Sequence, residues 1–236
     1  MSKVKYNKLP ELIPQEIIER VSKLSPAQLC DGMKDLGILR DGCMDASLMP
    51  VDENKIMIGT AYTVDTEEGD NFPIHVAIYQ GKPGYVLVVA GKGHTERAYI
   101  GDLMGAAADA IGLNGIVIDG FVRDKVGLKE LNIPIYAKGF MQRGPSKVGP
   151  GEINTVVTCA GVKVEPGDLI FGDYDGVTVI PRDRIEEVLE KAEKKSAYEE
   201  ERRKTIAEYV ACRDNNEELP DIAPGWVNEM KDKLGI

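Results

Sequence analysis

The alternation of short apolar strands with short helices between residues 85 and 137 constrains the fold more than any other feature. YVLVVA (85–90) and GIVI (115–118) are continuous apolar runs, and such runs are typical of strands covered on both faces. The segments between and after them predict an Ala-rich helix over 103–111, a short helix over 125–131 and a strand over 133–137. Strand–helix–strand order of this kind predicts parallel α/β units.

The segments before this region predict two helices and one further strand–helix pair. Apolar residues follow helical spacing over residues 14–37. Ser25 and Pro26 interrupt that spacing as an N-cap followed by a proline at the first helical position. KIMIGTAYTV (55–64) predicts a strand in which Gly59 marks a bulge or a close approach, and a helix follows over 73–80.

The segments after Gly139 predict an antiparallel portion and a helical C-terminus. Short strand-like runs separated by Gly, Pro and Asp lie at 155–159, 162–164, 169–171 and 177–180. A charged helix follows over 183–210, and a short one lies near 226–234. We expect an α/β domain over 1–181 and a helical extension over 182–236 that packs on the same or a neighbouring subunit.

Charge and cysteine usage narrow the class of protein. The formal net charge of −10 disfavours both nucleic acid and anionic membrane surfaces as partners. The four cysteines form no CxxC pair and only two histidines are present, which argues against a structural zinc site and favours reduced thiols. Neither a signal peptide nor an apolar run of about 18 residues is visible, so we expect a cytoplasmic protein.

The stretch GDLMGAAADAIGLNGIVIDGFVRD (101–124) carries the most chemistry. Its first residues begin a helix, where free backbone N–H groups suit a carboxylate. Its last residues follow a buried strand, where Arg123 can fork onto a carboxylate and Asp124 can hold Mg²⁺ through one carboxylate plus waters. Spacing alone equally allows Asp102 and Asp124 to be helix N-caps and Arg123 an ion-pair partner.

VIDGFVRD (117–124), together with the upstream GDLM, resembles the signature of the RraA-like family. That family includes class II 4-hydroxy-4-methyl-2-oxoglutarate/4-carboxy-4-hydroxy-2-oxoadipate aldolases and the protein regulators of RNase E activity. The resemblance covers roughly residues 25–181 and continues in GDNFPIHVA (69–77), GYVLVVA (84–90), IPIYAKG (133–139), RGPSKVGPGEINTVV (143–157) and VEPGDLIFGDYDGVTVIP (164–181). It implies a swivelling ββα domain with parallel and antiparallel strands, which assembles into homotrimers or hexamers.

The same resemblance implies a role for each residue of the motif. In the aldolases, pyruvate is held by the arginine of the RD pair, here Arg123, and by the backbone of the GDL turn, here Gly101 with Leu103 and Met104. The aspartate after the arginine, here Asp124, supports a divalent cation, Mg²⁺ or Mn²⁺. The aspartate of the turn, here Asp102, contacts water bound to that cation.

The C-terminal segment separates the branches of the family. The aldolases carry a C-terminal helical segment from which an acidic side chain of a neighbouring subunit reaches the site, and Glu199 is our choice among Glu199, Glu200 and Glu201. A solvated charge run on a surface helix is the alternative for each of them. The loop Ala90–His94 departs from the family pattern. Asn71 and His75 are four residues apart and can share one helix face, and for them a structural role is favoured over catalysis.

Taken together, the sequence predicts a metal-dependent aldolase that cleaves a 4-hydroxy-2-oxo acid to pyruvate, with oxaloacetate decarboxylation as a side activity. Two alternatives remain open. One is a non-catalytic regulator that binds a protein partner, and the other is a lyase or hydratase on a related sugar acid.

Overall fold

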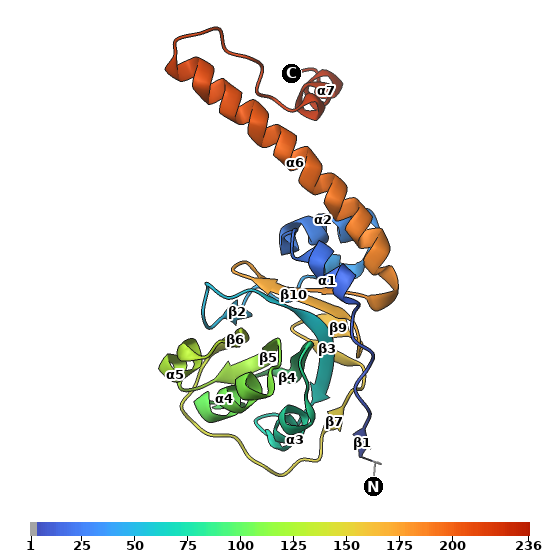
Figure 1. Ribbon diagram of the computed structural model, residues 1–236, viewed down its shortest axis with the longest axis vertical. Coiled ribbons are helices and arrows are strands. Elements are labelled where there is room, and N and C mark those ends of the chain that lie inside the picture. The colour runs from blue at the N-terminus through green and yellow to red at the C-terminus, as the bar shows by residue number, and fades with distance from the viewer. Residues whose placement is uncertain (1–3) are drawn as a thin grey trace. The chain divides into compact units, whose positions relative to one another are not determined.

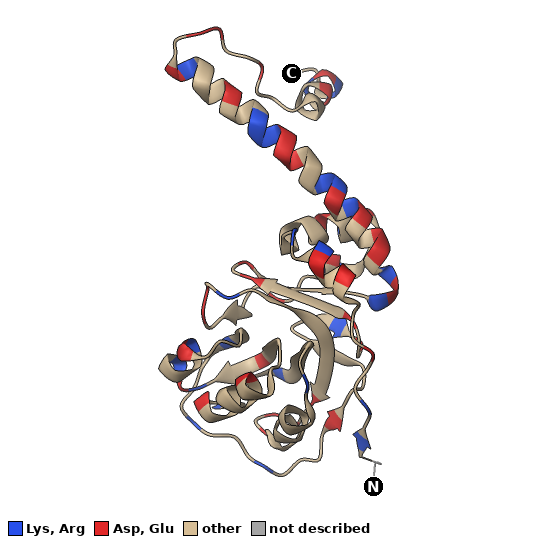
Figure 2. Ribbon diagram, in the orientation of Figure 1, with Lys and Arg blue, Asp and Glu red and all other residues tan. Residues whose placement is uncertain are grey.

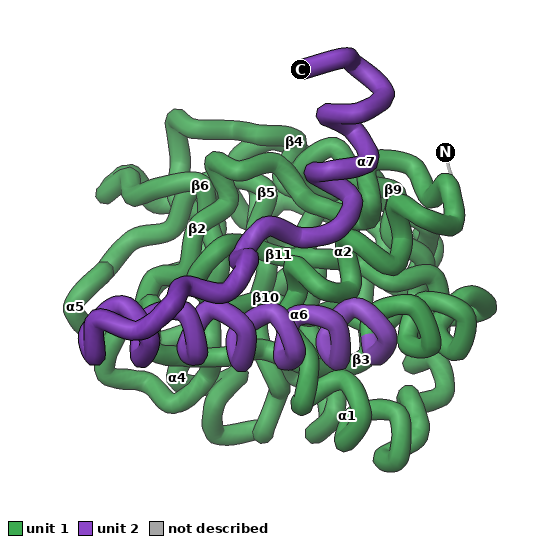
Figure 3. Tube along the Cα trace, turned by 90° about the horizontal axis from the view of Figure 1, so that it is seen from above, with its two compact units in different colours: residues 1–192 green, residues 193–236 purple. Residues whose placement is uncertain are grey.

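The structure is a computed structural model and describes residues 4–236. The chain divides into two compact units, residues 1–192 and residues 193–236, which are shown in green and purple in Figure 3. The predicted site residues up to Asp124 belong to the first unit, and Glu199 belongs to the second.

The first unit is built on a twisted sheet with the order β1-β7-β3-β4-β5-β6-β2. Strands β3 to β6 pair in parallel, and so do β1 and β7. Antiparallel pairs join β2 to β6, β7 to β3, and β10 to both β3 and β11. A separate antiparallel pair is formed by β8 and β9. The strands are β1 (Lys5–Tyr6), β2 (Met49–Pro50), β3 (Met57–Asp65), β4 (Tyr85–Ala98), β5 (Gly115–Val122), β6 (Ile135–Phe140), β7 (Glu152–Ile153), β8 (Val157–Cys159), β9 (Val162–Val164), β10 (Leu169–Asp173) and β11 (Gly176–Ile180).

Helices connect the parallel strands and cover one face of the sheet, as Figure 1 shows for α3, α4 and α5. The helices and 3-10 turns are α1 (Gln15–Val21), α2 (Pro26–Asp35), η1 (Leu39–Gly42), α3 (Phe72–Gln80), α4 (Asp102–Ile111), α5 (Lys125–Glu130), η2 (Arg182–Arg184), α6 (Ile185–Asp214) and α7 (Gly225–Leu234). The apolar side chains between these helices and the sheet form one core cluster, which includes Ile74, Leu87 and Ile118.

The N-terminal helices close a second core against the β10–β11 hairpin and the first turns of α6. Leu29 and Met33 of α2 are fully buried together with Val188 of α6. Helix α2 begins with the predicted capping arrangement, because the Ser25 side chain accepts from the backbone N–H of Gln28 and Pro26 is the first helical residue.

The mixed α/β class predicted from the sequence is confirmed. One prediction was too short: the strand expected over 85–90 continues to Ala98 in β4, with register shifts against β5 at Val89, His94 and Ala98. These irregularities explain why its second half lacks the apolar pattern of the first. Gly59 does mark a close approach, since a Cβ there would lie 2.9 Å from the Gly84 carbonyl oxygen.

The second unit contains the remainder of α6 and helix α7. Lys, Arg, Asp and Glu alternate along α6 (Figure 2), and its buried side chains all belong to its first turns, up to Ala192. Over residues 4–236, no helix is long and apolar enough to cross a membrane. The domain boundary at residue 181 stays a prediction.

Candidate active site

A cavity of about 280 Å³ lies where the end of β5 meets the start of α4. Five predicted residues line it, namely Gly101, Asp102, Leu103, Met104 and Arg123. Asp124 is not part of the lining but adjoins it, since its Oδ2 is 3.3 Å from Arg123 Nε. The cavity is at the small end of the range for ligand pockets, which suits a small acid.

Gly101 allows the start of α4 to meet the end of β5. The Ile100 carbonyl accepts the backbone N–H of Arg123 at 3.0 Å, which ties the two segments together. A Cβ on Gly101 would lie 2.3 Å from Asp124 Oδ2, so only glycine fits here without displacing that carboxylate.

The N-terminus of α4 presents backbone donors to the cavity. The N–H groups of a first helical turn have no carbonyl partner within the helix, and the helix dipole favours an anion beside them. The Leu103 N–H donates to Asp102 Oδ1 at 2.8 Å. The Met104 N–H belongs to the next residue of the same first turn. This end of α4 can therefore bind a carboxylate.

Arg123 and Asp124 owe their positions to a sharp turn after β5. Asp124 has φ 59° and ψ 47°, a left-handed conformation that a non-glycine residue adopts at some cost. Helix α5 begins at the next residue, but the Asp124 side chain makes no capping hydrogen bond to it. Its Oδ2 lies instead 3.4 Å from the backbone N of Asp102. The N-cap alternative from the sequence is therefore not how this carboxylate is used.

Asn71 forms a buried wall of the cavity and is only 2% exposed. Its Nδ2 donates to the Tyr99 carbonyl at 2.9 Å and to Met104 Sδ at 3.2 Å, so it fixes two other lining residues. Its Oδ1 is buried without a hydrogen-bond partner in the part of the chain that the structure describes. A buried acceptor of this kind is costly unless a ligand or water satisfies it.

His75 lies one helical turn further along α3 and also lines the cavity. The pKa of His75 is below its usual value, because burial disfavours the charged ring and Lys147 repels it. Its imidazole is therefore neutral near pH 7 and adds no positive charge to the site.

The loop over residues 143–151 closes the cavity and is held by one buried carboxylate. Asp70 Oδ2 accepts from Ser146 Oγ at 3.0 Å and from the backbone N–H of Val148, and Oδ1 accepts from the Gly149 N–H at 3.1 Å. Burial by itself raises the pKa of Asp70, but these hydrogen bonds outweigh it, so the pKa lies below its usual value. Asp70 is thus ionised at neutral pH and anchors the loop.

The donor set near Arg123 fits a hydrated hard cation. Within residues 4–236, no group of three or more His, Cys, Asp or Glu side chains is placed to hold a metal ion. The carboxylates of Asp102 and Asp124 are both accessible beside the cavity, and Mg²⁺ is commonly held by one or two carboxylates plus waters and substrate oxygens. Asp124 would hold such an ion through its carboxylate, and Asp102 would contact water bound to the ion.

Lys92 and Lys138 of the first unit are not part of the cavity lining. Lys138 is paired with buried Asp119 at 2.6 Å, and Lys92 is paired with Asp65 at 3.4 Å. An ion-paired ammonium is a poor Schiff-base nucleophile. In the second unit, Glu199 is paired with Arg203 on α6 at 3.3 Å. Whether it reaches the site of another copy stays a prediction.

Sequence reasoning missed Tyr99 and Lys147 as lining residues. Tyr99 follows the irregular half of β4, and Lys147 lies in a loop without periodicity, so neither had a pattern to mark it. A larger cavity of about 970 Å³ lies elsewhere in the first unit and includes Arg40 and Arg182 but no predicted site residue.

Comparison with known proteins gives one family and several relatives. The family model described as RraA-like (Aldolase/RraA) matches residues 26–179. A protein of Halalkalibacterium halodurans named "Putative 4-hydroxy-4-methyl-2-oxoglutarate aldolase" is 42% identical over 167 residues, which is 71% of this chain and 80% of the relative.

Two solved structures share the fold. An uncharacterized protein from Pseudomonas syringae has a TM-score of 0.74 at 26% identity, covering 83% of this chain and 94% of that one. A Streptomyces coelicolor protein, described as an unusual member of the RNase ES inhibitor RraA family, has a TM-score of 0.73 at 26% identity. The match covers 80% of this chain and 98% of that one.

Proposed function

The chain belongs to the RraA-like family, and from that premise we propose that it is an aldolase acting on a 4-hydroxy-2-oxo acid. The substrate is of the 4-hydroxy-4-methyl-2-oxoglutarate type, and the products are pyruvate and a second oxo compound. The observation that carries this proposal is the convergence of the Arg123 guanidinium and the N-terminus of α4 on one small cavity. The name of the 42% identical relative supports the same activity.

In this proposal, the pyruvyl end of the substrate binds between Arg123 and the first turn of α4. The carboxylate accepts from the backbone N–H groups there, and the guanidinium pairs with the carboxylate or with the 2-oxo oxygen. Arg123 Nε is already oriented by Asp124 at 3.3 Å, so the guanidinium needs little reorganisation to stabilise negative charge.

Cleavage requires removal of the C4 hydroxyl proton and stabilisation of the pyruvate enolate. A water or hydroxide positioned by Asp102 and Arg123 acts as the base that takes that proton, the C3–C4 bond breaks, and its electron pair moves onto the pyruvyl half. A divalent cation held by Asp124, Mg²⁺ or Mn²⁺, would polarise the 2-oxo group and stabilise the enolate as a Lewis acid. Water then protonates C3 to give pyruvate. Oxaloacetate decarboxylation forms the same enolate and is the expected side activity.

The active form is proposed to be a homo-oligomer, a trimer or hexamer. Among residues 4–236 of one chain, Asp102 is the one acidic residue that lines the cavity. A second acid from a neighbouring copy, for which Glu199 is the candidate, would complete the acid–base set.

Pyruvate release measured with a lactate dehydrogenase coupling tests the proposal. The substrates are 4-hydroxy-4-methyl-2-oxoglutarate, 4-carboxy-4-hydroxy-2-oxoadipate and oxaloacetate, each assayed with Mg²⁺, with Mn²⁺ and with EDTA. Pyruvate from a hydroxy-oxo acid that EDTA abolishes is the expected result.

The other outcomes distinguish the alternatives. Pyruvate from oxaloacetate alone would indicate a working enolate site with a different substrate, such as a sugar acid. No metal-dependent pyruvate from any of the three would reject the aldolase and favour a non-catalytic regulator. The Streptomyces coelicolor neighbour is described as an unusual member of the RNase ES inhibitor RraA family.

A further inference from the structure

The cavity has a second cation that the mechanism above does not use. Among its lining residues, Arg123 and Lys147 are positively charged and Asp102 is negatively charged. Arg123 is engaged with Asp124 and with the pyruvyl end of the substrate. A 4-hydroxy-2-oxo acid such as 4-hydroxy-4-methyl-2-oxoglutarate also carries a second carboxylate, on the half that leaves as the other oxo acid.

The backbone of Lys147 is fixed on both sides, although its side chain is exposed. Its neighbours Ser146 and Val148 both donate to Asp70 Oδ2, and Asp70 is only 2% exposed. The Ser146 carbonyl also accepts the backbone N–H of Asn71 at 3.0 Å. A lysine between two residues tied to one buried carboxylate is held at a defined place on the cavity rim.

Lys147 lines the cavity and has no ion-pair partner among the described residues. It repels the protonated form of His75 and so contributes to the lowered pKa of that histidine. The buried Oδ1 of Asn71, which has no partner in the described structure, lies on the same cavity wall. An unpaired cation and an unsatisfied acceptor around one cavity indicate a ligand with both a carboxylate and a hydroxyl group.

We propose that Lys147 binds the second carboxylate of the substrate, so that the site selects 4-hydroxy-2-oxo dicarboxylic acids over monocarboxylic ones. This inference rests on the proposed aldolase function and adds the residue that recognises the second carboxylate of the substrate. Lys147 acts on the half of the substrate that departs when the C3–C4 bond breaks. It is therefore a specificity residue and takes no part in forming the enolate.

The test compares two substrates that differ only in that carboxylate. Cleavage of 4-hydroxy-4-methyl-2-oxoglutarate gives two pyruvates, whereas 4-hydroxy-4-methyl-2-oxopentanoate, with a methyl group in its place, gives pyruvate and acetone. The variants are Lys147→Met, which keeps the length of the side chain, and Lys147→Arg, which keeps its charge. Lys82→Met, at an exposed turn before β4, is the matched control.

Lys147→Met should lower kcat/KM for the dicarboxylate about 10- to 100-fold, mostly through KM, as expected for losing a charged hydrogen bond. It should change kcat/KM for the monocarboxylate by less than about twofold. Lys147→Arg should retain most of the selectivity. Exchange of the pyruvate methyl protons with deuterated water needs only the pyruvyl half and should be unchanged in every variant.

An equal loss on both substrates, or a loss of proton exchange, would assign Lys147 a structural role and overturn the inference. So would a Lys147→Met variant that keeps its preference for the dicarboxylate. If the unmodified protein cleaves neither substrate and does not exchange pyruvate protons, the proposed function itself fails and this inference fails with it. If the wild-type protein exchanges pyruvate protons but cleaves both substrates equally well, only the inference about Lys147 fails.

Discussion

At the scale of single residues, the proposed chemistry depends most on Arg123. Arg123→Ala should lower kcat/KM for pyruvate release about 10²- to 10³-fold, the usual cost of losing a donor to a developing negative charge. The kcat/KM of Arg123→Lys should lie between those of the wild-type protein and Arg123→Ala, because an ammonium keeps the charge but cannot make the paired contacts of a guanidinium.

The control for this prediction is Arg143→Ala. Arg143 is a 61% exposed arginine whose guanidinium lies 3.9 Å from the exposed Glu96 carboxylate. Steady-state kinetics, with circular dichroism to confirm folding, make the measurement. Near-wild-type turnover in folded Arg123→Ala protein would remove Arg123 from the mechanism.

Gly101 is required for a steric reason rather than for backbone flexibility, since its φ of −130° is open to any residue. A Cβ there would lie 2.3 Å from Asp124 Oδ2 and 3.0 Å from Arg123 Nε. Gly101→Ala should therefore displace the ion pair and lower kcat/KM about tenfold or more, because small misplacements of catalytic groups are costly.

Thermal melting separates this effect from general instability. The displaced side chains are more than 40% exposed, so the melting temperature should change little. Gly225→Ala is the matched control, because a Cβ at Gly225 meets nothing within 4 Å. A fully active Gly101→Ala protein would contradict the placement of Asp124 at the site.

The residues whose place in the site the sequence predicted and the contacts that it did not predict differ in how they are encoded. Arg123 and Asp124 are adjacent and follow a buried strand, and the GDL turn begins an obvious helix, so local pattern was enough. Asn71 contacts the backbone of Tyr99 across 28 residues, and Asp70 holds Val148 across 78 residues. Such contacts arise only when the sheet has formed, and no periodicity in a single sequence reports them.

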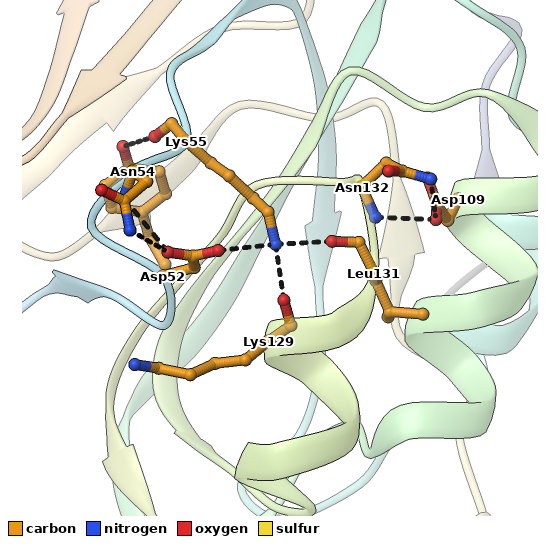
Figure 4. Close-up of polar contacts among 8 residues, drawn as sticks. Asp52, Asn54, Lys55, Asp109, Lys129, Leu131 and Asn132 are labelled. Carbon is orange, nitrogen blue, oxygen red and sulfur yellow. Dashed lines mark hydrogen bonds and ion pairs between the residues drawn. The ribbon is translucent and has the colours of Figure 1, made fainter.

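At the scale of secondary structure, Lys55 closes the end of α5 (Figure 4). Its Nζ donates to the carbonyls of Lys129 and Leu131 and pairs with Asp52 at 2.8 Å. The last carbonyls of a helix need such partners, and a cation there also complements the helix dipole. The pKa of Asp52 is lowered to about 2, chiefly by the hydrogen bond from the same ammonium and further by hydrogen bonds from Asn54.

Lys55→Met should therefore lower the free energy of unfolding by about 1–3 kcal/mol, the usual range for hydrogen bonds to a charged group. Lys129→Met removes a charge from the same helix but leaves its carbonyl in place, so it should have little effect. The deficit of Lys55→Met should be present at pH 7 and shrink as the pH falls from about 4 towards 2, where Asp52 becomes protonated. Urea unfolding of the wild-type protein and both variants at pH 7 and pH 3 tests this. Equal unfolding free energies for Lys55→Met and the wild-type protein would exclude a stabilising role of Lys55 at the end of α5.

Asp168 joins two turns of the β10–β11 region. From its buried carboxylate we expect the free energy of unfolding to depend on pH in the mildly acidic range. Its carboxylate accepts the backbone N–H groups of Glu165 at 2.8 Å and Arg182 at 3.0 Å. Burial nevertheless raises the pKa of Asp168 to about 6, above its usual 3.8. The folded protein then binds a proton that the unfolded chain has lost, so stability from this group falls as the pH rises from about 4 to about 6.

Asp168→Asn removes the titration and keeps one acceptor. Relative to this variant, the wild-type protein should lose at most about 3 kcal/mol of unfolding free energy across that window. Asp70 titrates below its usual pKa and does not interfere. Urea unfolding at pH 4, 5, 6 and 7 gives the dependence of the unfolding free energy on pH for the wild-type protein and for Asp168→Asn. The same dependence in both proteins would contradict the raised pKa of Asp168.

At the scale of the whole molecule, the second unit is a helical segment whose apolar side chains are incompletely covered in one chain. Beyond Ala192, no residue of α6 is buried, and Tyr198, Ile206 and Val210 remain 39–45% exposed. Pairs such as Glu199–Arg203 support the helix locally, but each adds only about 0.3–0.5 kcal/mol. A long helix of this kind usually gains its stability from packing, which a neighbouring copy would supply.

This arrangement leads to a complementation experiment on the predicted role of Glu199. If Glu199 acts in the site of a neighbouring copy, the Arg123→Ala and Glu199→Gln proteins are each inactive. The two substituted residues of any one site, however, come from two different protomers. Mixed oligomers then contain sites with an intact Arg123 from one protomer and an intact Glu199 from another. For random 1:1 mixing through such head-to-tail contacts, about a quarter of the sites are complete.

Co-expression with two affinity tags isolates the mixed oligomers. Their pyruvate release should approach about a third of the wild-type rate for a trimer, in which every mixed ring has one complete site, and about a quarter for a hexamer. Glu200→Gln, one position along the same charged stretch, is the matched control and should be active alone. Mixed oligomers as inactive as their parents would place any essential Glu199 and Arg123 in the same protomer. A fully active Glu199→Gln protein would leave α6 with a structural role. Asp102, which lines the cavity together with Arg123, would then act without an acid from α6.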